Sequence, residues 1–410
     1  MSDLYVVGVG MTPFGKWLDR SVKDLTREAV NMALADAGCD KDAIGAAFFA
    51  NAAQGAVEGQ YMIPGQLALR AMGFSRIPVI NVENACASAS SAFYLACMQL
   101  RSGEADVVLA IGADKMFTPD KDRNLAVLTG AWDVHEVDTT LSNLGQLGQG
   151  VETPARIHGE AHSIFMDVYA ALAKQHMRRF GTTQRQLAAV AAKNHRHSVE
   201  NPRSQYRTDF SVDEVLSARI ISWPLTLPMC APISDGAAAA VLCRREALHR
   251  FGSRRAIRIH ASVLASGSDR GAEDLQNHIC RRAALLAYEK AGLGPSDMSL
   301  AEVHDATAMG EIIQSENLGL CQPGDGGAMA ERGETALGGR LPLNPSGGLE
   351  SKGHPIGATG LAQIFELVTQ LRHEGGKRQV ENARFAVAEN GGGFHGYEEA
   401  AACVTILGRE

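Results

Sequence analysis

The chain is organised around residues 84–101, which read NACASASSAFYLACMQLR. A β-like run at 77–82 and a short turn precede this stretch, and a Ser-Gly pair ends it. Small and apolar residues occupy nearly every face of the helix that this pattern predicts, so we expect the helix to be buried. Cys86 stands at its start, where unpaired N–H groups and the positive end of the helix dipole favour a thiolate. Cys86 is therefore a candidate nucleophile, although an inert buried cysteine fits this stretch alone equally well.

Composition sets the broad class of the protein. A chain of 410 residues, 45% hydrophobic and 21% charged, is typical of a soluble globular protein with two or three fused units of core. The net charge of -7 argues against nucleic acid as a partner. No segment is long enough to span a membrane, and the N-terminus enters a strand-like run rather than a signal peptide. The eight cysteines form no CxxC pair, which predicts neither a metal site nor disulfides and fits the cytoplasm.

Strands and helices alternate along the first part of the chain. Strand-like runs at 4–9, 46–50 and 106–114 are separated by a helical pattern at 22–37 and by the helix that Cys86 opens. This alternation predicts an α/β architecture.

The second half of the chain repeats this order. Residues 281–292 (RRAALLAYEKAG) resemble residues 27–38 (REAVNMALADAG). A second helix of small and apolar residues opens at Gly357, and both buried helices reach a Gln-Leu-Arg end after the same number of positions. We therefore predict two homologous α/β halves whose buried helices pack on each other between two sheets. That arrangement is a five-layer αβαβα sandwich.

Residues 119–232 lack the pattern of the repeat. They carry clusters of charged residues and of glycines, and they predict helices at 161–180 and 183–195. A region of this length is too long for a connector, so we expect an inserted loop domain that acts as a lid or substrate domain. The predicted division is an N-terminal half made of 1–118 with 233–252, the insertion at 119–232, and a C-terminal half at 253–410.

A histidine occupies the place in the second half that Cys86 occupies in the first. Residues 347–360 read GGLESKGHPIGATG and put His354 just before the second buried helix. If a pseudo-twofold axis relates the two helices, their N-termini converge and bring the imidazole towards the thiol. A base in that position can take the thiol proton. A lone histidine is usually a satisfied polar group, so this pairing depends on the repeat.

Two more candidate site segments lie in turns that follow predicted strands. His304-Asp305 ends a predicted strand at 301–306, where the pair can orient a water or donate a hydrogen bond to a thioester oxygen; a structural turn is the alternative. The glycines 391–393 follow Glu389 and Asn390. Consecutive glycines let backbone N–H groups approach a substrate oxygen, as an oxyanion hole requires, although many loops are rich in glycine.

The combination of the Cys86 helix start, Ser234-Asp235-Gly236, His304-Asp305 and the GHPIGATG run at 353–360 resembles the thiolase superfamily. The resemblance is strongest to the sterol-carrier-protein-type thiolases and covers nearly the whole chain. It implies an acyl-CoA acyltransferase that cleaves a 3-oxoacyl-CoA with CoA, or forms one in reverse, through an acyl-Cys86 intermediate. It also implies no tightly bound cofactor, coenzyme A as a substrate, and a homodimer or tetramer.

The resemblance assigns expected roles to individual residues. His354 would activate Cys86 and help to hold the thioester oxygen, and His304 would help to bind an oxygen of the second substrate. The backbone N–H groups of Cys86 and Gly391 would form the other oxyanion hole. Ser234 would contact the pantetheine arm of CoA, and the insertion would cover CoA.

The sequence departs from the family pattern at two positions. Thiolases move the proton on the α-carbon with a second cysteine, from a Cys-x-Gly-Gly or a His-Asp-Cys-Phe motif, and these places hold Glu389 and Ala306 here. We predict that Glu389, in a partly dry pocket that raises its pKa, takes over the acid/base role, with His395 or His304 as substitutes. A structural ion pair of Glu389 is the alternative. Ala306 leaves room for a bulkier acyl group, such as an aromatic, dicarboxylic or steroid side-chain derivative.

Other functions stay open at this point. One is retro-aldol cleavage of a CoA thioester, or C-acylation of an aromatic acceptor, together with a small partner protein that bears an OB-fold and a zinc ribbon. Retro-aldol cleavage would not need Cys86, so Cys86→Ala separates it from thiolysis. Another is a non-catalytic scaffold that binds CoA esters. The presence of both Cys86 and His354 speaks against a scaffold, and a rapid reaction of Cys86 with iodoacetamide would argue further against it.

Overall fold

Nine strands form the main sheet of the computed structural model, which describes residues 3–153 and 162–409. In spatial order they are β3 (Val79–Val82), β2 (Ala46–Ala50), β4 (Val107–Asp114), β7 (Gly236–Arg244), β1 (Leu4–Met11), β8 (Ile257–Ser266), β11 (Ala401–Gly408), β10 (Phe385–Gly392) and β9 (Leu300–Glu302). The first five strands belong to one half of the fold and the last four to the other. The two halves are joined where β1 pairs with β8 through Leu4 to Val6. The two expected sheets are thus continuous along one edge.

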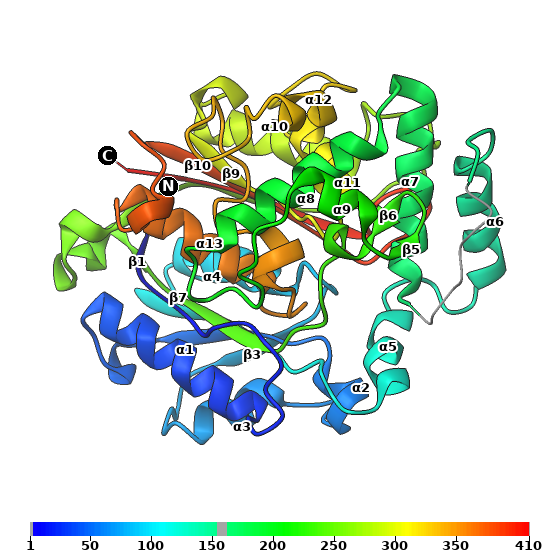
Figure 1. Ribbon diagram of the computed structural model, residues 1–410. Coiled ribbons are helices and arrows are strands. Elements are labelled where there is room, and N and C mark those ends of the chain that lie inside the picture. The colour runs from blue at the N-terminus through cyan, green and yellow to red at the C-terminus, as the bar shows by residue number, and fades with distance from the viewer. Residues whose placement is uncertain (1–2, 154–161, 410) are drawn as a thin grey trace.

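Two buried helices lie between the halves of the sheet (Figure 1). They are α4 (Ser88–Ser102) and α13 (Thr359–Leu371), and their side chains form one core with residues from strands of both halves. Helices α1 (Val22–Ala37) and α3 (Pro64–Arg70) cover the outer face of the first half, and α10 (Ile279–Ala291) covers that of the second. The predicted five-layer α/β sandwich is confirmed, with the two buried helices as its middle layer.

Local sequence signals explain where these helices begin and end. Ser21 and Asp24 form a capping box at the start of α1, and Gly38 closes the helix in the left-handed conformation. Gly103 ends α4 in the same way. Gly360 lets α13 approach α4 closely, because a Cβ at this position would collide with the Ser90 hydroxyl.

The region between β4 and β7 adds a layer of helices beside the sandwich, drawn in green at the right of Figure 1. Its elements are α5 (Lys121–Thr129), α6 (Val137–Leu147), α7 (Ile164–Phe180), α8 (Gln184–Ser198), α9 (Val212–Ser217), β5 (Ile220–Ser222) and β6 (Leu225–Thr226). Helices α7 and α8 share a core with α11 (Ala308–Asn317). The predicted helix at 161–180 begins at Ile164, and its first position lies outside the described residues.

The expected strand at 301–306 is shorter than its hydrophobic pattern suggests. β9 ends at Glu302, so His304 and Asp305 lie in the loop between β9 and α11. Short helices α2 (Gln54–Glu58) and α12 (Gly326–Glu331) complete the described elements of regular structure beyond single turns. The loop position matters because it frees the His304 side chain from the face alternation of a strand.

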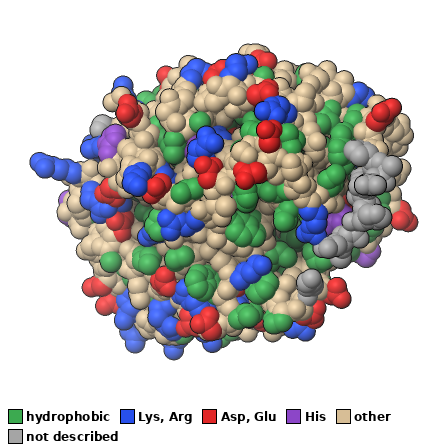
Figure 2. All heavy atoms as spheres, viewed as in Figure 1, with side chains coloured by type: hydrophobic (Ala, Val, Ile, Leu, Met, Phe, Trp, Pro, Cys, Tyr) green, Lys and Arg blue, Asp and Glu red, His purple; other side chains and the backbone are tan. Residues whose placement is uncertain are grey.

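The visible surface is mixed in charge. Figure 2 shows Lys and Arg side chains scattered among Asp and Glu side chains over the viewed face. This distribution does not form the basic stripe that nucleic-acid binding requires on that face. Within the described ranges, no helix combines the length and hydropathy that a membrane crossing needs.

Candidate active site

Cys86 and His354 meet at the interface of the two halves. Cys86 lies in the turn that precedes α4, and His354 lies in the segment that precedes α13. The Nε2 atom of His354 is 3.3 Å from the Sγ atom of Cys86. The convergence that the internal repeat predicts is therefore present in the structure.

Hydrogen bonds on the far side of the ring fix the tautomer of His354. The Thr359 hydroxyl donates to the carbonyl oxygen of Pro355 at 3.1 Å, and its oxygen lies 2.6 Å from Nδ1 of His354. Because the hydroxyl proton is engaged, Thr359 Oγ1 accepts from an Nδ1–H group. The lone pair of Nε2 then faces the Cys86 thiol, which is the arrangement of a base beside the group it deprotonates.

Ser234 positions His354 from behind the site. Its hydroxyl oxygen accepts the backbone N–H of His354 at 3.0 Å and donates to the carbonyl oxygen of Pro232 at 3.1 Å. The side chain is 0% exposed. The structure thus gives Ser234 a different place from the expected pantetheine contact, because the hydroxyl is already engaged and is shielded by the His354 backbone.

A buried carboxylate links the His354 segment to the first half. Asp114 accepts the backbone N–H groups of Ala53 at 2.9 Å and Gly357 at 2.6 Å. It also accepts the side-chain amide of Asn51 at 2.7 Å. Burial raises the pKa of Asp114 to about 7 against these hydrogen bonds. Asp114 therefore ties the loop after β2 to the turn that opens α13.

The resting Cys86–His354 pair is neutral. Burial raises the pKa of the Cys86 thiol to about 12, and the negative charges of Asp114 and Glu83 add to the effect. Burial, followed by the neighbouring His304 and Lys352, holds the pKa of His354 well below its usual value. This corrects the expectation of a resting thiolate: Cys86 precedes the N-cap of α4 rather than lying in its first turn, and desolvation outweighs the helix dipole.

The imidazole ring of His304 lies close to both Cys86 and His354. Its ring centroid lies 5.2 Å from that of His354, and potential ligand atoms of Cys86, His304 and His354 lie within 4.8 Å of one another. The residue is 4% exposed, and among the described residues neither ring nitrogen has a hydrogen-bond partner. Burial lowers the pKa of His304 to about 4, so the ring is neutral at physiological pH. A buried polar ring without a partner is suited to a substrate oxygen.

Asp305 does not share this space with His304. Its carboxylate accepts the backbone N–H of Leu349 at 2.8 Å and the side-chain amide of Asn194 at 3.1 Å. Burial raises the pKa of Asp305 well above its usual value. Asp305 therefore anchors the loop that carries His304.

Glu389 lies behind His304. Its carboxylate accepts the backbone N–H of His304 at 3.0 Å and the Cys280 thiol at 3.3 Å. Burial, with the charge of Glu399 adding to it, raises the pKa of Glu389 to about 8. The raised pKa agrees with the expected dry surroundings. Glu389 is not, however, among the described residues that line the cavity next to Cys86, which is called the central cavity below. His395, a suggested substitute, is exposed on the turn after β10.

Gly393 rather than Gly391 reaches the thiol. Gly391 lies within β10 and pairs with Ala402 of β11. The backbone N–H groups of Cys86 and Gly393 both act to lower the pKa of Cys86, so they face its sulfur. Gly392 packs against the turn of residues 84–87, where a Cβ would collide with the backbone. The candidate oxyanion donors are therefore Cys86 and Gly393, two residues beyond the expected position.

A cavity of about 610 Å³ opens onto these groups. Cys86, His304, His354 and Ala306 contribute to its wall, and most of the remaining lining is apolar, with several side chains from the insertion. Ala306 stands beside His304 where a cysteine was expected by resemblance. The cavity is large enough for a long acyl or pantetheine segment.

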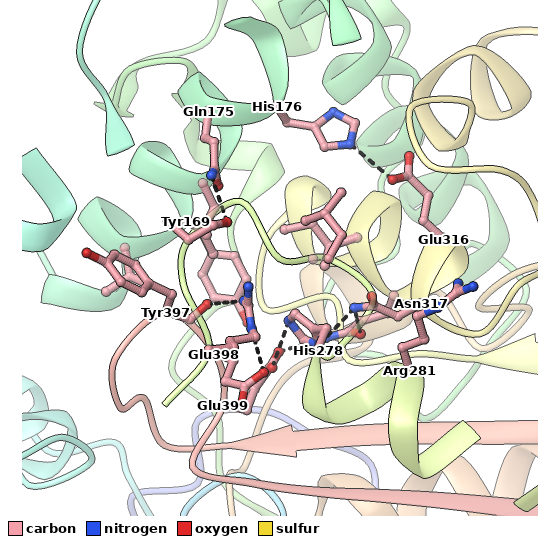
Figure 3. Close-up of a pocket in the computed structure, with 18 of the residues that line it drawn as sticks. Tyr169, Gln175, His176, His278, Arg281, Glu316, Asn317, Tyr397, Glu398 and Glu399 are labelled. Carbon is pink, nitrogen blue, oxygen red and sulfur yellow. Dashed lines mark hydrogen bonds and ion pairs between the residues drawn. The ribbon is translucent and has the colours of Figure 1, made fainter. Parts of the chain in front are cut away.

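Glu399 is a cavity residue that the sequence did not indicate. It lines the central cavity and also a smaller adjoining one of about 70 Å³, which is the pocket drawn in Figure 3. Phe165, Tyr169 and Gly393 are shared by the two cavities in the same way. Glu399 lies in the turn between β10 and β11, so no strand or helix periodicity marks it.

Two clusters have donor atoms that a metal ion could use: Cys86 with His304 and His354, and His278 with Cys280 and Glu399. In the second cluster Nδ1 of His278 accepts the backbone N–H of Cys280 at 3.2 Å, so Nε2 carries the proton. That tautomer turns an N–H group, and not a lone pair, towards Glu399. The second cluster is therefore arranged for hydrogen bonding. All eight cysteines are free in the structure.

Comparison with known families covers most of the chain. Residues 4–211 match the thiolase N-terminal domain, and residues 263–409 match the domain described as thiolase C-terminal domain-like. The chain belongs to the thiolase superfamily. The resemblance drawn from the sequence motifs is confirmed.

The curated relatives of this thiolase-family protein have names that refer to different functions. The chain is 37% identical over 397 residues to sterol carrier protein 2 of Oryctolagus cuniculus, covering 94% of this chain and 69% of that protein. It is 37% identical over 401 residues to the acetyl-CoA acetyltransferase of Methanothermobacter thermautotrophicus, covering 97% and 98%. It is 33% identical over 383 residues to the benzoylsuccinyl-CoA thiolase subunit BbsB of Thauera aromatica, covering 92% and 91%. Relatives within the superfamily therefore differ in the substrates that their names give.

Solved structures share the fold of the whole chain. The Ltp2-ChsH2(DUF35) aldolase superposes with a TM-score of 0.76 at 23% identity, covering 99% of this chain and 97% of that one. Human mitochondrial 3-ketoacyl-CoA thiolase in complex with CoA superposes with a TM-score of 0.70 at 17% identity, covering 100% and 98%. Both confirm the thiolase fold.

Proposed function

We propose that the protein is a thiolase-type acyltransferase that cleaves a 3-oxoacyl-CoA with CoA, or condenses two acyl-CoA esters in reverse, through an acyl-Cys86 intermediate. The observation that carries the proposal is the 3.3 Å contact between Sγ of Cys86 and the lone pair of His354 Nε2. Membership of the thiolase superfamily and the adjoining cavity support it.

His354 acts as the base for Cys86. Both groups are neutral at rest, so the proton moves from Sγ to Nε2 as the thiol attacks the 3-oxo carbon of the substrate. Thr359 holds Nδ1–H throughout and keeps the acceptor on the correct nitrogen. The backbone N–H groups of Cys86 and Gly393 stabilise the oxyanion that forms on the attacked carbonyl.

His304 binds an oxygen of the second substrate. Its unpartnered ring nitrogens provide one donor that can hold the thioester oxygen of the departing acyl-CoA. Glu389 supports this role as a positioning residue, because its carboxylate accepts the His304 backbone N–H and keeps that loop in place. The proposed part of Glu389 in acid/base chemistry is then indirect.

The cavity supports a bulky acyl group. Its volume of about 610 Å³ and largely apolar wall fit an aromatic or branched acyl-CoA. Ala306 adds space next to the reacting groups. Side chains from residues 119–232, among them Phe165 and Tyr206, close one side of the cavity. The insertion is accordingly proposed as the lid over CoA, with the two halves divided as the sequence predicts.

A second copy of the chain is the proposed partner of the exposed edge of the sheet. β3 pairs with β2 on one side, and Ile80 on that strand is 38% exposed. Tyr61 and Met62 are 77% and 76% exposed in the loop that leads into α3, and α3 contacts β3 through the Gly65 N–H and the Asn81 side chain. An open edge strand next to exposed apolar side chains is suited to strand pairing between subunits. A small OB-fold and zinc-ribbon protein is a further proposed partner, in line with the two-part name of the Ltp2-ChsH2(DUF35) aldolase.

Turnover with a panel of 3-oxoacyl-CoA esters and CoA tests the function. We expect thiolysis of at least one bulky ester, its loss in Cys86→Ala, and wild-type rates in Cys39→Ala, whose side chain is not part of the described cavity lining. Cleavage that persists in Cys86→Ala would replace the proposal by a retro-aldolase. The wild-type protein, alone or with its small partner, could instead bind CoA esters without any turnover. That result would indicate a non-catalytic scaffold.

A further inference from the structure

A second carboxyl group lines the same cavity as the reacting thiol. Glu399 lies on the wall of the central cavity together with Cys86, His304 and His354. Tyr169 lines this cavity and also the smaller adjoining one, as Glu399 does. The carboxyl and the thiol border a single space.

The Glu399 carboxyl is held from outside the cavity. The side-chain amide of Gln314 donates to Oε1 at 2.7 Å, and the Cys280 thiol lies 3.7 Å from Oε2. Figure 3 shows His278 and Glu399 turned towards each other, with Nε2 of His278 3.5 Å from Oε2. Because the His278 tautomer places a proton on Nε2, Gln314 and His278 both present donors to the carboxyl. The orientation of the group is fixed without an ion pair to a permanently charged base.

Gly391 provides the space for this arrangement. A Cβ at position 391 would lie 2.6 Å from Cγ of Glu399 and 3.2 Å from its Oε1. Any other residue in β10 at this position would displace the carboxyl. The glycine that the sequence suggested for an oxyanion hole thus serves to seat Glu399 next to the loop that leads to Gly393.

We infer that Glu399 is the catalytic acid/base for the α-carbon of the acyl-CoA that leaves or attacks. The inference rests on the proposed function, and it assigns to a residue of the turn between β10 and β11 the proton transfer that neither Ala306 nor the buried Glu389 is placed to perform. Burial, with the charge of Glu398 adding to it, raises the pKa of Glu399, which favours the protonated form that the cleavage direction needs.

The proton balance closes with the groups at hand. His354 takes the Cys86 proton as the sulfur bonds to C3 of the 3-oxoacyl-CoA. The C2–C3 bond then breaks, its electron pair forms the thioester enolate, and Glu399 protonates C2 to release the shortened acyl-CoA. Exchange with water then restores the Glu399 proton and removes the proton held by His354. His354 takes the thiol proton of the incoming CoA as this thiol attacks acyl-Cys86, and passes it to the departing Cys86 sulfur.

The test separates α-carbon chemistry from acyl transfer. The full-length protein is incubated in D2O with acetyl-CoA, and with any acyl-CoA product found in the panel, and deuterium at the α-carbon is followed by mass spectrometry. In parallel, the acyl group is exchanged between acyl-CoA and isotopically labelled CoA. This exchange needs Cys86 and His354 but no proton transfer at carbon. Glu399→Gln, Glu399→Asp, Glu389→Gln and Cys86→Ala are compared with the wild type.

We expect Glu399→Gln to lower deuterium incorporation and thiolysis at least 100-fold while acyl exchange stays within about threefold of the wild type. Glu399→Asp withdraws the carboxyl by one methylene and keeps its acidity, so it should retain part of the deuterium incorporation. It replaces Glu399→Gln in the test if the amide variant folds poorly. Three results would overturn the inference. Deuterium incorporation could survive in Glu399→Gln, it could be lost in Glu389→Gln instead, or it could be absent from the wild type. Failure of the proposed function itself would be distinct, because acyl exchange would then be absent from the wild type or unchanged in Cys86→Ala.

Discussion

The Nε2 atom of His354 lies 3.3 Å from the Sγ atom of Cys86, although 268 positions separate the two residues in the chain. The contact forms because α4 and α13 are the corresponding helices of the two halves and pack against each other, with Gly360 near the start of α13 close to Ser90 near the start of α4. The active site is therefore a product of the duplication. Interactions that hold the two halves in register should also hold this pair.

Loss of the Thr359 hydroxyl should impair catalysis more than folding. Thr359→Val removes the acceptor for Nδ1–H, so the His354 proton is free to move to Nε2 and to block the base. We expect kcat/KM for thiolysis to fall about 10- to 100-fold and the free energy of unfolding to fall by about 1 kcal/mol. Thr369→Val on the same helix removes a hydroxyl that donates to the carbonyl of Phe365 and is the matched control. Equal kinetic losses in both variants would refute the tautomer argument.

Two glycines of one turn allow a test of the oxyanion donors. Gly393 and Gly396 have φ angles of +66° and +64°, so an alanine is strained in either place. A Cβ at Gly396 meets nothing within 4 Å, whereas one at Gly393 meets the carbonyl of Ala131 at 3.1 Å. Both variants should lose about 1 kcal/mol of stability, and Gly393→Ala alone should lose at least tenfold in kcat. Similar kcat values for the two variants would show that the Gly393 N–H is not an oxyanion donor.

The neutral resting pair predicts a slow thiol. With the pKa of Cys86 raised from 9.0 to about 12, the thiolate fraction at pH 7 is below that of an ordinary cysteine. The higher nucleophilicity of a more basic thiolate offsets part of this deficit, so carbamidomethylation of the Cys86 peptide should be roughly 10- to 100-fold slower than that of free cysteine. Its rate should still rise between pH 8 and 10. A rate that is fast and constant from pH 6 to 8 would indicate a thiolate–imidazolium ion pair instead.

Glu389 should make stability depend on pH. Its pKa is raised from 4.5 to about 8 in the folded state, so the folded protein binds more protons than the unfolded chain between these values. This contribution is present below pH 4.5 and is lost as the pH rises towards 8. Because each pKa unit corresponds to about 1.4 kcal/mol, Glu389→Gln should gain about 2–4 kcal/mol relative to the wild type between pH 5 and pH 8 in urea unfolding. A difference between variant and wild type that does not change with pH would mean that Glu389 is charged in the folded protein.

The sequence was most informative where local pattern and repeat agreed. The bounds of α1 followed from its helical spacing and from Gly38, and the approach of His354 to Cys86 followed from the matched positions of the two buried helices. Charge state could not be read in the same way, because Cys86 is buried among residues of both halves, such as Ala53 and Ile356, and this burial makes it a neutral thiol. Local pattern suggested a thiolate, and tertiary burial reversed it.

Residues in turns were the hardest to place from sequence. β10 extends to Gly392 because it pairs along its length with β11, and this pairing moved the site glycine from 391 to 393. The same pairing brings Glu399 to the cavity. Neither position has a periodic signal, since both depend on the register between two strands. Ser234 was found by its motif, yet its contacts show that it supports the His354 backbone rather than the cavity wall.

The most direct test of the account is the acylation state of Cys86. Wild-type protein is mixed with a reactive acyl-CoA, quenched in acid and digested, and the mass of the peptide that contains Cys86 is measured before and after a chase with CoA. The account predicts that this peptide gains the mass of the acyl group, that CoA removes it, and that His354→Asn slows both steps at least 100-fold. Turnover of a 3-oxoacyl-CoA with no acyl group on Cys86 at any time would contradict it.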